Sequence, residues 1–276
     1  MIYHSVLLVK VVVGVYSVDV KKSKLGQHFL NSESALKKIV GAARLTKKDV
    51  ILEIGPGKGA LTKELLLKTK KVVAVEKDRK LIEFLKEKFE SEIKEKKLIL
   101  INEDALKTDS SKLKLKKYKV VANIPYYITG KLLRKILSEE KQPQLAVLLL
   151  QNEVAERISK DKKESLLSLS IKVYGEPSYI GTVSAKKFNP PPKVDSAILL
   201  IDNISRNFFK EINEEKFFEL IREGFRSKRK KLINNLSKFG NKEKLERVFY
   251  KSGIKEGERA ENISALKFKS ILRNLD

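Results

Sequence analysis

Short apolar runs alternate with amphipathic segments between residues 49 and 150, and this alternation restricts the fold more than any other feature of the chain. We expect strands over residues 50–54, 72–76, 98–101, 120–123 and 145–150, and helices over 60–68 and from 78 to about 94. Apolar runs of this length are typical of strands that are buried on both faces. Strands that alternate with helices predict βαβ units and a mostly parallel sheet with helices on both sides.

The pattern changes near residue 203. Two further strands are expected near residues 179–183 and 197–202, separated by a loop at Pro190, Pro191 and Pro192, since proline cannot donate to a sheet ladder. Residues 208–276 show helical periodicity instead. The sequence therefore predicts an α/β domain with a seven-stranded sheet over residues 21–203 and a small helical domain over 204–276.

We expect residues 1–20 to form an extension outside both domains. Their apolar stretch is short and is interrupted by Lys10, which disfavours both a membrane span and a signal peptide. The expected location is the cytoplasm.

Composition restricts the function. The chain has 59 Lys and Arg against 35 Asp and Glu, a formal net charge of +24. Such a charge favours a polyanionic partner, because clustered cations release counterions from phosphates; a general lysine bias is the alternative. There is no cysteine, and the only histidines are His4 and His28, so thiolate nucleophiles, iron–sulfur clusters and the usual zinc sites are excluded. We expect no metal, and chemistry that depends on a bound cofactor.

A glycine-rich turn, EIGPGKG at residues 53–59, follows the first expected strand. Glycine lets the backbone approach a ligand closely, and no Gly-Lys-Ser/Thr follows, which disfavours a P-loop. Glu76 lies 21 positions after Gly55 at the end of the next strand, where a carboxylate can accept hydrogen bonds from both hydroxyls of a ribose. Asp104, beyond the third strand, can accept a hydrogen bond from the amino group of an adenine. The alternatives are a plain tight turn and two surface acids.

The fourth expected strand ends in Asn123-Ile124-Pro125-Tyr126, the most specific motif of the chain. An adenine amine is a poor nucleophile because its lone pair is delocalised into the ring. The Asn123 side-chain oxygen and the Ile124 carbonyl can accept its two hydrogens as the nitrogen becomes tetrahedral, which stabilises the transition state. Pro125 makes the turn rigid, and the Tyr126 ring can stack on a base taken out of its helix. The alternative is an ordinary strand-to-turn exit with a buried tyrosine.

Together these residues resemble the ribosomal RNA adenine N6-dimethyltransferase family that is named for kasugamycin resistance. The resemblance covers about residues 21 to 270. Its motifs, in order, are LGQHFL at 25–30, LEIGPG at 52–57 with Leu61 and Thr62, NIPYY at 123–127, QNEVA at 151–155, FNPPPKVDS at 188–196, FRSKRKKL at 225–232 and AENIS at 260–264.

The resemblance implies a Rossmann-like class I methyltransferase domain, S-adenosylmethionine as cofactor, and dimethylation of adjacent adenosines near the 3′ end of small-subunit rRNA in a pre-assembled particle, by a monomer. It implies that the cofactor contacts His28, Leu30, Gly55, Gly57, Glu76, Asp104 and Asn123. It places the target adenine between Tyr126 and Phe188, next to Asn123, Ile124 and Pro125. It implies that RNA phosphates bind Arg226, Lys228, Arg229, Lys230 and Lys231.

The chain departs from the family pattern at His28, where many relatives have Asn, and at residues 166–170, LLSLS in place of Tyr-Gly-Arg-Leu-Ser. Three alternatives stay open: the large-subunit rRNA adenine methylase of macrolide resistance, a non-catalytic ribosome-assembly or nucleic-acid-binding factor, and a small-molecule methyltransferase. The closing motif and the loop at 188–196 favour the small-subunit enzyme over the large-subunit methylase. The intact Glu76 and Asn123 disfavour a non-catalytic factor. The net charge of +24 disfavours a small-molecule methyltransferase.

Overall fold

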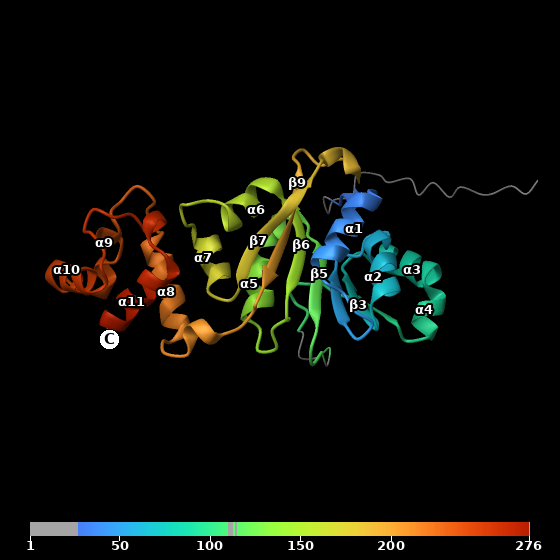
Figure 1. Cartoon of the computed structure of the whole chain (residues 1–276), viewed down its shortest axis with the longest axis horizontal. Helices are drawn as coiled ribbons and strands as arrows, with labels where there is room; N and C mark the ends of the chain where they lie inside the picture. Colours follow the sequence, from blue (N-terminus) through green and yellow to red (C-terminus); the bar gives the residue numbers. More distant parts are fainter. Residues whose placement is uncertain (1–26, 110–112, 114, 276) are drawn as a thin grey trace, which may run out of the picture.

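The computed structural model describes residues 27–275 except 110–112 and 114, so the predicted extension at residues 1–20 lies outside the described residues. A seven-stranded sheet with the order β4-β3-β2-β5-β6-β9-β7 forms the centre (Figure 1). Its parallel strands are β2 (Val50–Ile54), β3 (Lys71–Glu76), β4 (Leu98–Asn102), β5 (Lys119–Asn123) and β6 (Ala146–Gln151). At one edge, β9 (Ser196–Asp202) pairs antiparallel with β6 on one side and with β7 (Glu176–Val183) on the other. The predicted mostly parallel sheet is confirmed.

Helices cover both faces of the sheet because successive strand residues point to opposite sides. Ile51 and Val121 face a core that includes α1 (Glu33–Ala42), α2 (Ala60–Lys68) and α3 (Arg79–Lys88). Their neighbours Leu52 and Val120 face the opposite core, which includes α5 (Thr129–Ser138), α6 (Asn152–Ser159) and α7 (Leu166–Lys172). Burial on both faces explains why these strands are continuously apolar.

The prediction of one continuous helix from residue 78 to about 94 is wrong in one respect, because the helix is broken at Phe89. Helix α3 ends at Lys88, and α4 (Glu90–Lys94) begins after Phe89, whose φ of −118° leaves the helical region. The break lets the Phe89 side chain, which is only 4% exposed, pack against the glycine-rich turn, where a Cβ added to Gly59 would lie 2.5 Å from the ring.

A second, two-stranded sheet was not predicted. β1 (Phe29–Leu30) pairs antiparallel with β8 (Phe188–Asn189), which follows the 3-10 turn η2 (Ala185–Lys187). This pairing joins the start of the described chain to the loop after β7. It places Leu30 opposite Phe188, at the edge of the main sheet where β2 and β5 end.

The C-terminal helices gather at one end of the sheet, beyond α7 (Figure 1). They are α8 (Glu214–Gly224), α9 (Leu232–Asn235), α10 (Lys242–Lys251) and α11 (Ala265–Leu275), with 3-10 turns η3 (Asn207–Phe209), η4 (Ser237–Phe239) and η5 (Ala260–Asn262). Aromatic rings fill the junction: Tyr174, after α7, lies 5.3 Å from Phe209 and 6.0 Å from Phe218 between ring centroids. Among the described helices, none is long and apolar enough to cross a membrane.

Candidate active site

A cleft of about 880 Å³, counting the solvent at its mouth, lies at the carboxyl ends of β2, β3 and β5. This is where ligands bind in open parallel sheets, because the strand order changes direction there and leaves a crevice. The β1–β8 pair closes one side. Most of the predicted site residues line the cleft: His28, Leu30, Gly55, Gly57, Glu76, Asn123, Ile124, Pro125, Tyr126 and Phe188.

The glycine-rich turn forms the floor beside β2. Gly55 and Gly57 have φ values of +70° and +57°, in the left-handed region that favours glycine. A Cβ on Gly57 would lie 2.9 Å from the Phe29 ring, and one on Gly55 would lie 3.3 Å from the Asn123 carbonyl oxygen. The backbone of the turn therefore faces the cleft directly, and no side chain fits between it and β1 or β5.

Glu76 ends β3 at the wall of the cleft and is only 6% exposed. Its Oε2 accepts from the Gly57 backbone N–H at 3.3 Å and its Oε1 from the Asp78 N–H at 2.9 Å. Burial raises the pKa of this carboxyl above its usual value, although the two N–H donors oppose the shift. The backbone thus holds Glu76 in one orientation, as an acceptor fixed beside the glycine-rich turn.

Asp104 does not line the cleft. Its Oδ2 accepts from the Lys77 ammonium at 2.9 Å, and its Oδ1 accepts from the Leu106 backbone N–H at 3.0 Å. The hydrogen bond from Lys77 lowers the pKa of the Asp104 carboxyl. A contact between Asp104 and a cofactor adenine stays a prediction, and it requires Lys77 to release one carboxylate oxygen.

The Asn123 amide has a defined orientation at the end of β5. Its Nδ2 donates to the backbone carbonyl of His28 at 3.2 Å, and a carbonyl can only accept, so the amide nitrogen must point there. The Oδ1 is then the end left for a ligand. Among the described residues, no hydrogen bond ends on the carbonyl of the neighbouring Ile124 either. Both residues line the cleft, and neither of these two oxygens is engaged by another described group.

Aromatic side chains flank these acceptors. The Tyr126 hydroxyl lies 2.8 Å from the Ser196 hydroxyl, and its ring stacks with the His28 ring at 6.1 Å between centroids. The His28 Nδ1 donates to the Pro190 carbonyl at 2.8 Å. His28 therefore bonds to the loop after β8 through its ring and to Asn123 through its backbone carbonyl. Phe188, 5% exposed, also lines the cleft, where the β1–β8 pair holds it. Stacking of a base between Tyr126 and Phe188 stays a prediction.

Sequence analysis missed a buried acid beneath the site. Glu53, in β2, is 1% exposed, and neither of its carboxylate oxygens has a hydrogen-bond partner among the described residues. The Thr62 hydroxyl on α2 also has no such partner, although its interaction with Glu53 opposes the rise in the pKa of this carboxyl. Burial raises the pKa of Glu53 to about 8, with a further contribution from the Glu76 charge. An acid inside an otherwise apolar strand was the signal that could have identified it.

Five predicted RNA-binding cations, which we call the basic loop, lie between α8 and α9, well away from the cleft. All five are exposed: Arg226, Lys228, Arg229, Lys230 and Lys231. Arg226 is 3.6 Å from Glu223, but the other four have no acidic partner among the described residues. The basic loop is thus a concentrated positive charge beside the C-terminal helices, with four of its cations unpaired by any described acid.

Comparisons with known proteins agree with this fold. Residues 18–276 match the family described as ribosomal RNA adenine dimethylase. The chain is 39% identical over 257 residues to the ribosomal RNA small subunit methyltransferase A of Fusobacterium nucleatum, covering 91% of this chain and 96% of the relative. Its identity to the protein of the same name from Clostridium botulinum is 38% over 266 residues, covering 94% of this chain and 95% of that one.

Two solved structures resemble most of the chain. A dimethyladenosine transferase from Plasmodium falciparum superposes with a TM-score of 0.76 at 28% identity, covering 89% of this chain and 96% of that one. A 23S rRNA methyltransferase, ErmE, gives 0.73 at 23% identity, covering 90% and 99%. The second likeness concerns the fold alone.

The sheet and the cleft at its carboxyl edge define a Rossmann-like class I methyltransferase. The chain belongs to the ribosomal RNA adenine dimethylase family. It is therefore an rRNA methyltransferase, and membership of this family implies S-adenosylmethionine as the methyl donor.

Proposed function

We propose that the protein dimethylates N6 of adjacent adenosines near the 3′ end of small-subunit rRNA, in a pre-assembled small-subunit particle during ribosome biogenesis. We further propose that it acts as a monomer in the cytoplasm. The observation that carries this proposal is the hydrogen bond of Asn123: its amide nitrogen is held by the His28 carbonyl, which leaves its oxygen as the end for a ligand, and both Asn123 and Ile124 line the cleft.

The residues at the cleft fit a nucleoside cofactor. The glycine-rich turn at Gly55 and Gly57 brings bare backbone to the cleft, and Glu76 presents a fixed carboxylate suited to ribose hydroxyls. His28 and Leu30 would hold the same group from β1, and Asp104 would accept from its adenine amine. When bound, S-adenosylmethionine supplies an electrophilic methyl group on a sulfonium.

The chain itself orients the target base and stabilises its reacting amine. Tyr126 and Phe188 would stack on the two faces of the flipped adenine, while Pro125 keeps the turn rigid. The Asn123 oxygen and the Ile124 carbonyl accept the two amine hydrogens, and these bonds strengthen as positive charge develops on nitrogen. No general base is needed, since the methylated ammonium is acidic enough to lose its proton to water.

The names of the relatives support the choice of the small subunit, and the basic loop supports RNA in general as the substrate. The relatives with about 40% identity are named for the ribosomal small subunit. The basic loop gives the helical domain a surface suited to RNA phosphates, with affinity that falls as salt rises.

The test is transfer of labelled methyl from S-adenosylmethionine to immature small subunits that lack the modification, with large subunits alongside, followed by mapping of the labelled base. We expect dimethyladenine in the small-subunit rRNA alone. Label only in the large subunit would replace the proposal with a large-subunit methylase. Tight binding to the small subunit without any label would replace it with an assembly factor.

A further inference from the structure

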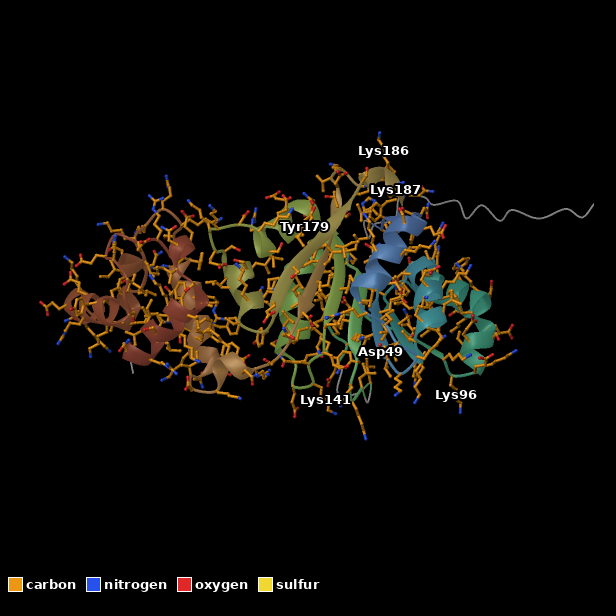
Figure 2. All side chains as sticks on the ribbon, in the orientation of Figure 1. Asp49, Lys96, Lys141, Tyr179, Lys186 and Lys187 are labelled. Carbon is orange, nitrogen blue, oxygen red and sulfur yellow. The ribbon has the colours of Figure 1, made fainter. Side chains whose placement is uncertain are left out.

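Two exposed lysines lie in a turn that is joined directly to residues lining the cleft, outside all the motifs assigned so far. Lys186 and Lys187 form the η2 turn, and the next residue is Phe188, which lines the cleft. Neither lysine has an acidic partner among the described residues. Figure 2 places both lysines at one edge of the molecule, and Lys96 and Lys141 at the opposite edge.

The turn that carries them is held firmly. The Ala185 backbone N–H donates to the Asp195 carboxylate at 2.8 Å, and the Lys187 carbonyl accepts from the Asn31 N–H at 2.8 Å. The β1–β8 pairing then continues directly from Phe188. The backbone is therefore fixed relative to the cleft, and only the two lysine side chains remain free to adapt to a ligand.

Adjacent like charges repel, so an unpaired lysine pair on a rigid turn stabilises nothing by itself. Some described lysines are neutralised along helices, as Lys94 is by Glu90 at 2.5 Å. Many others, Lys186 and Lys187 among them, have no ion pair with a described acid. Lys58, which also has no described acidic partner, lies in the cleft wall with its ammonium 5.1 Å from the centroid of the Phe29 ring. The cleft wall and the adjoining turn thus combine ring surfaces with positive charge that no described acid pairs.

We propose that Lys186 and Lys187 bind backbone phosphates of the nucleotides that flank the target adenine, so that the strand is clamped where the base enters the cleft. This inference rests on the proposed function, because it assumes that an RNA base occupies the cleft. A base that stacks on Phe188 remains covalently joined to its phosphates. Those phosphates must lie just outside the cleft, on the side of the turn that carries the two lysines and continues into Phe188.

The expected size follows from counterion release. Each phosphate contact to a single strand changes the slope of log affinity against log salt by about 0.7. Two contacts therefore contribute a slope of about 1.4, equivalent to roughly tenfold in affinity at physiological salt.

The test compares two double variants of the full chain with the same loss of charge. Lys186→Gln/Lys187→Gln removes the pair in the η2 turn, and Lys96→Gln/Lys141→Gln removes two exposed lysines from the opposite edge (Figure 2). We would measure KM and kcat with immature small subunits across a salt series. In parallel we would measure binding of a fluorescent single-stranded RNA, which needs no methyl transfer, and cofactor affinity by calorimetry.

We expect Lys186→Gln/Lys187→Gln to raise KM and the RNA dissociation constant by roughly tenfold and to flatten the salt slope by about 1.4, with cofactor affinity unchanged. The control pair should behave like the natural protein. Equal behaviour of the two variant pairs in the RNA-binding assay would overturn the inference. Failure of the natural protein to label small subunits would instead overturn the proposed function, while the binding comparison would still test the lysines.

Discussion

The cleft and the basic loop serve the same RNA in the proposed function, but they are built in opposite ways. The cleft residues are fixed by backbone contacts: Asn123 is held by the His28 carbonyl and Glu76 by the Gly57 and Asp78 N–H groups. In the basic loop, four of the five cations are exposed and have no acidic partner among the described residues. The polar groups Asn123 and Glu76 of the cleft have a defined geometry, whereas the basic loop presents exposed charge with little defined geometry.

This difference assigns the two regions different parts of the reaction. Groups fixed in a buried cleft can stabilise a transition state because they need no reorganisation when charge develops. Exposed cations attract phosphates over a longer range and adapt to many backbone arrangements, but salt screens them. We therefore expect changes in the cleft to lower kcat without salt dependence. Changes in the basic loop should raise KM in a salt-dependent way.

The largest effect is expected for Asn123→Ala. Loss of one of two acceptors for the reacting amine should lower kcat by about 10²- to 10³-fold, the usual cost of removing one preorganised hydrogen-bonding group. Cofactor affinity and the salt dependence of RNA binding should stay nearly unchanged. Steady-state kinetics on immature small subunits, with calorimetry for the cofactor, measure these quantities.

The matched control is Asn241→Ala, which removes the asparagine that caps α10 in the helical domain. It loses a hydrogen bond of a similar kind but should keep the natural kcat. An Asn123→Ala variant with full kcat would remove Asn123 from the mechanism. A salt-dependent loss would instead break the distinction between the two regions.

The second largest effect is expected on the free energy of unfolding. It tests whether water reaches the buried Glu53 carboxyl behind the cleft. Glu53 titrates near 4.5 in the unfolded chain and near 8 in the folded protein, because burial favours the neutral acid. Between these values the folded state keeps a proton that the unfolded state has lost. The free energy of unfolding is thus highest below the lower pKa and falls by about 1.4 kcal/mol per pH unit until the higher one.

Glu53→Gln removes this titration but keeps nearly the same shape. Relative to the natural protein, it should gain about 2–3 kcal/mol of stability between about pH 5 and pH 7, as measured by urea unfolding. The exposed Glu87→Gln serves as the control and should follow the natural curve. Parallel curves for Glu53→Gln and the natural protein would mean that Glu53 ionises in a hydrated site.

Features defined by local sequence were predicted well. The strands, the C-terminal helices and the glycine-rich turn depend on short apolar runs, periodicity and glycine spacing, and the sheet is confirmed. Clustering of Gly55, Glu76 and Asn123 followed because parallel strands end at one edge. The roles of these residues toward cofactor and RNA stay predictions.

Features that depend on long-range contacts were not predictable. The β1–β8 pair has two residues in each strand, too few for any periodicity, and its partners are far apart in sequence. The ion pair of Asp104 with Lys77 and the break at Phe89 likewise depend on what surrounds each side chain in space. Single-sequence patterns carry no information on these neighbours.

The smallest effect is expected in the basic loop, for Arg229→Gln/Lys230→Gln. Each lost phosphate contact with single-stranded RNA should change the salt slope by about 0.7, so the pair should raise KM roughly tenfold at physiological salt and leave kcat unchanged. The control is Lys94→Gln/Lys97→Gln, which removes the same charge from lysines already paired with Glu90 and Glu95. Neutralised lysines release few counterions, so this control should scarcely move KM. Equal effects of the two pairs would mean that net charge alone attracts the RNA, and the basic loop would then lose its distinct role.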